Sequence, residues 1–167
     1  NLFPWQAETW DISEDGKILT FTLRPDVRFS NGRTVVASDY VFTLERILNP
    51  KTKSPGQGFF RNIIGARDYQ DGKIDHVSGL KAPDDRTFII ELLKPDLPFL
   101  YILAMPFAYV VPREEVEKAG VDFGVHPIGT GPYVLADWQR GLLLRFKRNP
   151  DFYDLADIKL KEIKIMV

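Results

Sequence analysis

The first stretch of the chain alternates between apolar and polar positions, as β-strands do. Residues 18–24 alternate with β-branched and aromatic side chains, and residues 8–13 alternate more weakly. The turn signal Asp15-Gly16 lies between them, so we predict a β-hairpin. A second turn is predicted at Asn31-Gly32, since glycine permits the positive φ that tight turns require.

A helical period replaces the alternation at Ala37. The apolar residues that share one helical face are Tyr40, Val41, Leu44, Ile47 and Leu48. Ser38 or Asp39 can satisfy the first free N–H groups of this helix, and Asn49-Pro50 ends it. This is the helix that the pattern predicts most clearly.

The remaining pattern mixes short strands with short helices. Helices are predicted over 59–70, 98–104 and 113–119, and strands over 78–82, 87–92, 107–111, 133–138, 142–147 and 160–167. Hairpin strands interspersed with helices indicate an α/β fold of the mixed α+β kind. No internal repeat is visible, and nothing divides the chain, so we expect residues 1–167 to form a single fragment.

Composition is that of a folded globular protein and excludes several partners. Of 167 residues, 44% are hydrophobic and 27% are charged. The 22 basic and 23 acidic residues leave a net charge of −1, so no basic field exists to hold nucleic acid. The chain has no cysteine, which excludes disulfides and thiolate zinc sites.

No catalytic or metal-binding constellation can be assembled from the motifs. The two histidines, His76 and His126, are far apart, and each lacks a nearby His or Cys, so surface positions are expected. The run Gly129-Thr130-Gly131 lacks the lysine of a phosphate-binding loop. No Gly-x-Ser-x-Gly elbow occurs, and the acidic pair Asp84-Asp85 sits in a predicted turn. We therefore expect no catalytic residues, no metal and no cofactor.

The apolar stretches are too short to cross a membrane. The longest, over 99–111, is interrupted by Pro106, whereas a span needs about 20 residues. Because residue 1 is not methionine and the last predicted strand stops abruptly, we expect an excised segment.

Several motifs occur in order along the chain: the runs at 7–16, 21–32 and 37–47, the run His-Pro-Ile-Gly-Thr-Gly-Pro-Tyr at 126–133, Trp138, and Arg-Asn-Pro-Asp-Phe-Tyr at 148–153. Together they resemble the motifs of the bacterial extracellular solute-binding proteins of family 5, the dipeptide, oligopeptide and nickel type. Their order and intervals cover practically the whole chain. Val36 stands where the family often has a capping threonine. Each motif also has a structural interpretation, with Trp10, Phe21, Phe29 and Trp138 expected to face inward.

The resemblance implies a lobe of the type II periplasmic-binding-protein fold, with β-hairpins and a mixed sheet packed with helices. It implies that the chain is most of the N-terminal lobe and ends near the interlobe hinge, with the second lobe outside it. Full members are monomers, periplasmic, extracellular or lipid-anchored, that close two lobes around a peptide or small organic solute and deliver it to ABC transporter permease subunits. A ligand-sensing domain of the same fold in a regulatory protein is the alternative.

Residues 104–109 are the best local candidate for ligand contact. Met105, Phe107 and Tyr109 combine an adaptable side chain with aromatic ones, and Phe107 and Tyr109 would share a face of the strand predicted there. Nickel-type members carry an arginine in the corresponding stretch, whereas this chain has Met105 and Ala108, which favours a peptide or another organic solute. The alternative, that the three side chains belong to the core, stays open.

Overall fold

A computed structural model describes residues 3–167 and groups the chain into two compact units. Unit 1 comprises Asn1–Arg24 and Val36–Val110, and unit 2 comprises Pro25–Val35 and Val111–Val167. No sequence pattern indicated this division, because Pro25–Val35, the first segment of unit 2, is a short loop without a change in composition. Each unit is described by itself below.

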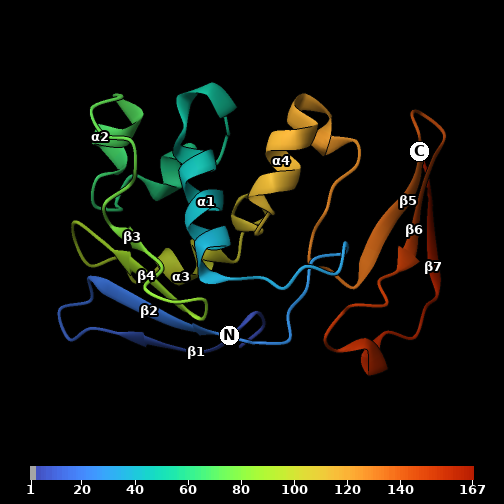
Figure 1. Ribbon diagram of the computed structural model, residues 1–167, viewed down its shortest axis with the longest axis horizontal. Coiled ribbons are helices and arrows are strands. Elements are labelled where there is room, and N and C mark those ends of the chain that lie inside the picture. Colours follow the sequence, from blue (N-terminus) through green and yellow to red (C-terminus); the bar gives the residue numbers. More distant parts are fainter. Residues whose placement is uncertain (1–2) are drawn as a thin grey trace. The chain divides into compact units, whose positions relative to one another are not determined.

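Unit 1 is built on a four-stranded antiparallel sheet of order β1-β2-β4-β3 (Figure 1). The strands are β1 (Ala7–Ile12), β2 (Ile18–Leu23), β3 (Leu80–Lys81) and β4 (Thr87–Glu91). Both predicted hairpins are confirmed. In the first one, Gly16 takes the positive φ of 69° that a side chain would disfavour.

Alternate residues of the central strands face the helices and form the core of unit 1. On this face the buried residues of β2 and β4 are Leu19, Phe21, Leu23, Phe88 and Ile90. Helix α1 (Ala37–Leu48) packs in the same core through Leu44, Ile47 and Leu48. The period of two in the strands and the helical period after Ala37 therefore meet in one apolar layer.

The ends of α1 follow from local chemistry. Val36 stands at the N-cap and has no side-chain acceptor, so Asp39 at the third position reaches back and accepts the Val36 N–H at 2.9 Å. Of the two predicted caps, Asp39 is thus the residue that makes this bond. At the other end Asn49 accepts the N–H of Lys51 at 2.9 Å and begins a 3₁₀ turn, η1 (Pro50–Thr52).

The helix predicted over 59–70 is interrupted. A 3₁₀ turn, η2 (Gln57–Phe60), is followed only later by α2 (Ala66–Gln70). Gly65 separates them with a φ of 81°, and an α-helix cannot continue through that conformation. Its positive φ is the physical reason for the break.

The strand predicted over 107–111 is wrong. Helix α3 (Phe99–Leu103) leads into a 3₁₀ turn, η3 (Pro106–Ala108), and extended backbone without sheet pairing follows. Pro106 explains the difference, since its fixed φ suits the first position of a helical turn and it lacks an N–H for a sheet. The predicted helix over 98–104 is confirmed as α3.

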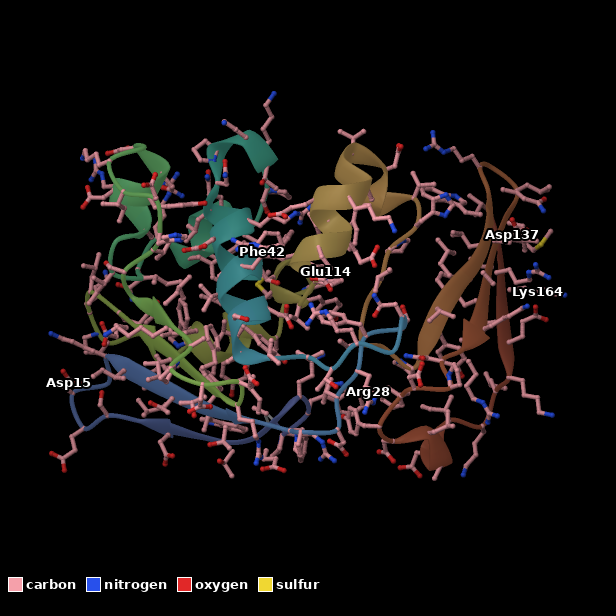
Figure 2. All side chains as sticks on the ribbon, in the orientation of Figure 1. Asp15, Arg28, Phe42, Glu114, Asp137 and Lys164 are labelled. Atoms are coloured by element: carbon pink, nitrogen blue, oxygen red, sulfur yellow. The ribbon has the colours of Figure 1, made fainter. Side chains whose placement is uncertain are left out.

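Unit 2 contains helix α4 (Arg113–Ala119) and a three-stranded sheet of order β5-β6-β7 (Figure 1). The strands are β5 (Tyr133–Gln139), β6 (Leu143–Arg148) and β7 (Glu162–Met166), and the 3₁₀ turns η4 (Gly120–Gly124) and η5 (Leu155–Asp157) lie between elements. Helix α4 and all three strands were predicted. In Figure 2, Glu114 marks α4, and Asp137 and Lys164 mark β5 and β7.

Two details of the sheets differ from expectation. The strand pairings of the described residues are all antiparallel, so this part of the chain does not contain the mixed sheet that was expected. Trp138, expected to face inward, is 41% exposed, because it lies on the edge strand β5. The guanidinium of Arg140 covers its ring at 5.3 Å. By contrast, Phe21 and Phe29 are buried as predicted.

The motif loops of unit 2 are tied to one another by hydrogen bonds. Ser30 donates its N–H to the Gly129 carbonyl at 2.8 Å. Asn149, with no exposed surface, donates its side-chain amide to the Gly131 carbonyl at 2.9 Å and its backbone N–H to the Pro132 carbonyl at 2.8 Å. The loop at 129–132 is thus held from two sides.

Candidate ligand-binding segment

The predicted segment lies in unit 1, between α3 and the end of η3, and its backbone is fixed by local hydrogen bonds. Met105 donates its N–H to the Ile102 carbonyl at 3.1 Å, and Ala108 donates to the Met105 carbonyl at 3.0 Å. Tyr109 donates to the Pro106 carbonyl at 3.3 Å. The segment is therefore a pair of linked turns with a defined shape.

The three candidate side chains differ in exposure. Tyr109 is 64% exposed, whereas Met105 and Phe107 are half-buried. The argument that Phe107 and Tyr109 share a face is wrong in its basis, because it assumed a strand and Phe107 belongs to a 3₁₀ turn. Tyr109 follows that turn, and its contact with a ligand stays a prediction.

Phe107 contacts a second aromatic residue from a distant part of the chain. Its ring stacks on that of Phe59, with centroids 6.0 Å apart and planes at 20°. Phe107 also packs against the core of unit 1, whereas Phe59 remains 44% exposed. Phe107 therefore serves the core with part of its surface and supports an exposed ring with another part.

Gly56 lies directly against Phe107. A Cβ atom built on Gly56 would stand 2.5 Å from Cγ of Phe107 and 2.7 Å from its Cβ, closer than any real side chain can approach. The φ of Gly56 is an ordinary −79°. The absence of a side chain at residue 56 is thus required by the position of the Phe107 ring and not by the backbone.

The loop that carries Gly56 and Phe59 is itself anchored. Gln57 donates its side-chain amide to the Leu48 carbonyl at the end of α1, at 2.7 Å. Gly56 donates its N–H to the Ser54 hydroxyl at 3.2 Å, and Phe59 donates to the Gly56 carbonyl at 3.1 Å. Both η2 and η3 contact α1, so one helix supports both halves of the aromatic pair.

Sequence reasoning missed Gly56 and Phe59. They precede the predicted segment by about fifty positions, and each fits a turn or a helix start on its own. Their link to Phe107 is a tertiary contact, which no local pattern carries. The structure brings Phe59 to Phe107, and it is this pair, with Tyr109 nearby in the chain, that forms the aromatic surface of the candidate segment.

Charged groups with shifted pKa values lie in turns. The Ser13 hydroxyl donates to the Asp15 carboxylate in the β1–β2 turn and lowers its pKa, and Figure 2 shows Asp15 at that turn. The backbone N–H of Arg86 lowers the pKa of Asp84 in the same way. These carboxylates stabilise turns, as predicted for Asp84, and give no pattern of a paired acid and base.

Both histidines lie at the surface, as predicted. His76 is 77% exposed, with its Nδ1 at 3.4 Å from the Glu45 carboxylate, and His126 is exposed. Within residues 3–167, no three His, Asp or Glu side chains gather as a metal site. None of the helices in this range is long and apolar enough to cross a membrane.

Known proteins match this chain over nearly its whole length. The family model of the bacterial extracellular solute-binding proteins, family 5 Middle, matches residues 1–167. The dipeptide-binding protein DppE of Bacillus subtilis is 32% identical over 168 residues, and the periplasmic oligopeptide-binding protein OppA of Escherichia coli is 32% identical over 167. Each alignment covers 96% of this chain and 30% of the relative, so the chain spans about a third of the relatives' length.

Solved structures agree with the fold. The substrate-binding domain of an oligopeptide ABC transporter from Bacillus anthracis is 35% identical, with a TM-score of 0.92 over 97% of this chain and 32% of that one. OppA of Haemophilus influenzae in complex with RPPGFSPFR is 29% identical, with a TM-score of 0.92 over 99% of this chain and 33% of that one. The predicted α+β fold and the resemblance seen in the motifs are confirmed. The chain belongs to the bacterial extracellular solute-binding proteins of family 5, a family of binding proteins and not of enzymes.

Proposed function

We propose that this chain is part of the substrate-binding subunit of an ABC importer, which captures peptides or a similar small organic solute. The observation that carries the proposal is the match of practically the whole chain to proteins named as oligopeptide- and dipeptide-binding. One structure that it resembles holds a nonapeptide, and Listeria monocytogenes OppA, 29% identical with a TM-score of 0.88, is bound to peptide. The solute would be captured outside the cytoplasmic membrane, in the periplasm or by a lipid-anchored protein.

The aromatic surface of unit 1 fits an organic ligand better than a metal chelate. Tyr109 and Phe59 are both exposed, and no acidic or basic side chain belongs to residues 104–109. An apolar surface contributes by excluding water from a ligand's side chains, while few polar groups are needed to orient it. Met105, Phe107 and Tyr109 remain our proposed ligand contacts on this basis.

Capture would need more than this chain. Binding proteins that enclose a ligand between lobes gain most of their affinity when both walls are present. We expect the full-length protein to bind a tripeptide with a micromolar or lower Kd. Residues 1–167 alone should bind it about 100-fold more weakly or not at all.

Isothermal titration calorimetry with both proteins tests the proposal. Tri-alanine and Ala-Phe-Ala serve as peptide probes, and deoxycholate serves as the contrasting probe. A relative that is 32% identical, YgiS of Escherichia coli, is named as a probable deoxycholate-binding periplasmic protein. Binding of deoxycholate without any peptide would refute peptide capture. A micromolar Kd for residues 1–167 alone would refute the need for a second wall.

A further inference from the structure

Gly56 and Phe59, which no motif singles out, belong with Phe107 to one structural unit. Phe59 stacks on Phe107 at 6.0 Å, and Phe107 occupies the space in which a side chain of residue 56 would stand. The exposed ring of Phe59 therefore rests on the half-buried ring of Phe107, and that ring lies where only a glycine at residue 56 leaves room for it. A change at any of the three alters where the exposed ring lies.

An exposed phenylalanine needs support to act as a defined surface. Phe59 is 44% exposed, yet its backbone N–H bonds to Gly56 and its loop is anchored to the end of α1 through Gln57. Phe107 is anchored separately, through the turn that begins at Pro106. The backbone of Phe59 and the ring on which it stacks are thus both anchored before any ligand arrives, which lowers the conformational entropy lost on contact.

We infer that Phe59, positioned by Phe107 and Gly56, determines ligand specificity by favouring peptides with an aromatic or large apolar side chain. The inference rests on the proposed peptide-binding function and adds a selectivity to it. Offset or parallel stacking of a ligand ring on Phe59 removes apolar surface of both partners from water. A peptide of small side chains gains nothing from that surface. Phe59 would touch the ligand, whereas Gly56 acts through Phe107 as a positioning residue.

Glycines 56 and 58 offer a matched pair of substitutions for the test. Gly56→Ala places a methyl group against the base of the Phe107 ring, so the ring or the loop must shift. Gly58→Ala meets nothing within 4 Å, and neither glycine has a positive φ that would forbid alanine. Both variants change the same short loop by one methyl group, and only Gly56→Ala disturbs the aromatic pair. Phe59→Ala removes the exposed ring directly.

The experiment measures selectivity in the full-length protein by isothermal titration calorimetry. The probes are Ala-Ala-Ala and the three tripeptides with one phenylalanine, and the readout is the ratio of their Kd values. We expect wild type to bind its best phenylalanine peptide about tenfold more tightly than tri-alanine. Phe59→Ala and Gly56→Ala should each reduce this ratio about threefold or more, while Gly58→Ala leaves it unchanged. A general loss of fold would lower both affinities alike and leave the ratio as it was.

The outcomes separate the inference from the proposed function. If wild type binds peptides without preferring phenylalanine, or if the ratio stays within about twofold in both Phe59→Ala and Gly56→Ala, the specificity role is wrong and peptide capture stands. If folded wild type binds none of the four peptides, the proposed function is contradicted and the inference fails with it. Restoration of the ratio by Phe59→Tyr, which keeps the ring, would support contact through the aromatic face.

Discussion

Asn149 is the side chain whose removal we expect to damage unit 2 most. It has no exposed surface, and its amide group makes two hydrogen bonds. The Nδ2 group donates to the Gly131 carbonyl at 2.9 Å, and the Oδ1 atom accepts the N–H of Asp151 at 3.1 Å. Asn149→Ala removes both bonds and leaves their partners without replacements, while the backbone N–H of residue 149 can still donate to Pro132.

The expected loss of stability follows from these two bonds. A net intramolecular hydrogen bond contributes about 1 kcal/mol, and a partner left unsatisfied costs roughly 1–3 kcal/mol according to its burial. Gly131 is only half-buried and Asp151 is exposed, which keeps both penalties at the lower end. Together these terms predict that Asn149→Ala lowers the free energy of unfolding by about 2–4 kcal/mol.

Urea denaturation followed by tryptophan fluorescence measures this loss, with Trp138 reporting from unit 2. Hydrogen–deuterium exchange over 128–135 shows whether the loop at Gly131 opens locally. Asn149→Asp should cost at least as much at neutral pH, because its carboxylate faces the Gly131 carbonyl as a second acceptor. Gln139→Ala, an exposed amide on β5, is the control and should change stability by less than about 0.5 kcal/mol. A loss below about 0.5 kcal/mol for Asn149→Ala, with unchanged exchange at 128–135, would refute the reasoning.

Two further predictions concern carboxylates of unit 1. Glu45 is 5% exposed and accepts the N–H of Val77 at 2.9 Å, so Glu45→Ala should cost about 1–3 kcal/mol in urea denaturation. Glu45→Gln retains an acceptor and should cost less; equal losses in both variants would argue against the hydrogen bond. For Asp84, the N–H donors of Arg86 and Thr87 lower the pKa below its ordinary 3.8, so its contribution to stability is present above that pH. This contribution is lost as the pH falls through the folded-state pKa; an NMR titration midpoint for Asp84 at or above 3.8 would contradict this.

The parts of the fold that the sequence predicts well are those fixed by local chemistry. Asp15-Gly16 marks the first hairpin because glycine accepts the positive φ found there. Helix α1 is found because its apolar residues keep a helical period and Asn49-Pro50 stops it. In each case the information lies within a few residues of the feature it predicts.

Prediction failed where a neighbouring residue or a distant contact decides the outcome. Residues 107–111 have the composition of a strand, but Pro106 starts a helical turn instead. Trp138 has the size of a core residue, yet β5 is an edge strand and Arg140 covers the ring. The division into two units was missed because neither unit is continuous in sequence. Pro25–Val35 belongs to unit 2, Val36–Val110 belongs to unit 1, and Val111–Val167 belongs to unit 2 again.

The glycines of unit 1 show that a local sequence pattern cannot predict a tertiary contact. Gly16 needs to be glycine because of its own positive φ, and this requirement could be inferred from the Asp15-Gly16 turn pattern. Gly56 has an ordinary φ, so its local sequence gives no reason for glycine, and it looks equivalent to Gly58 two positions later. Only the ring of Phe107 distinguishes them, because it fills the space at Gly56 and leaves that at Gly58 open. At Gly56 a tertiary contact alone requires the glycine, and that contact joins the aromatic segment predicted from the sequence to the exposed ring that the sequence did not predict.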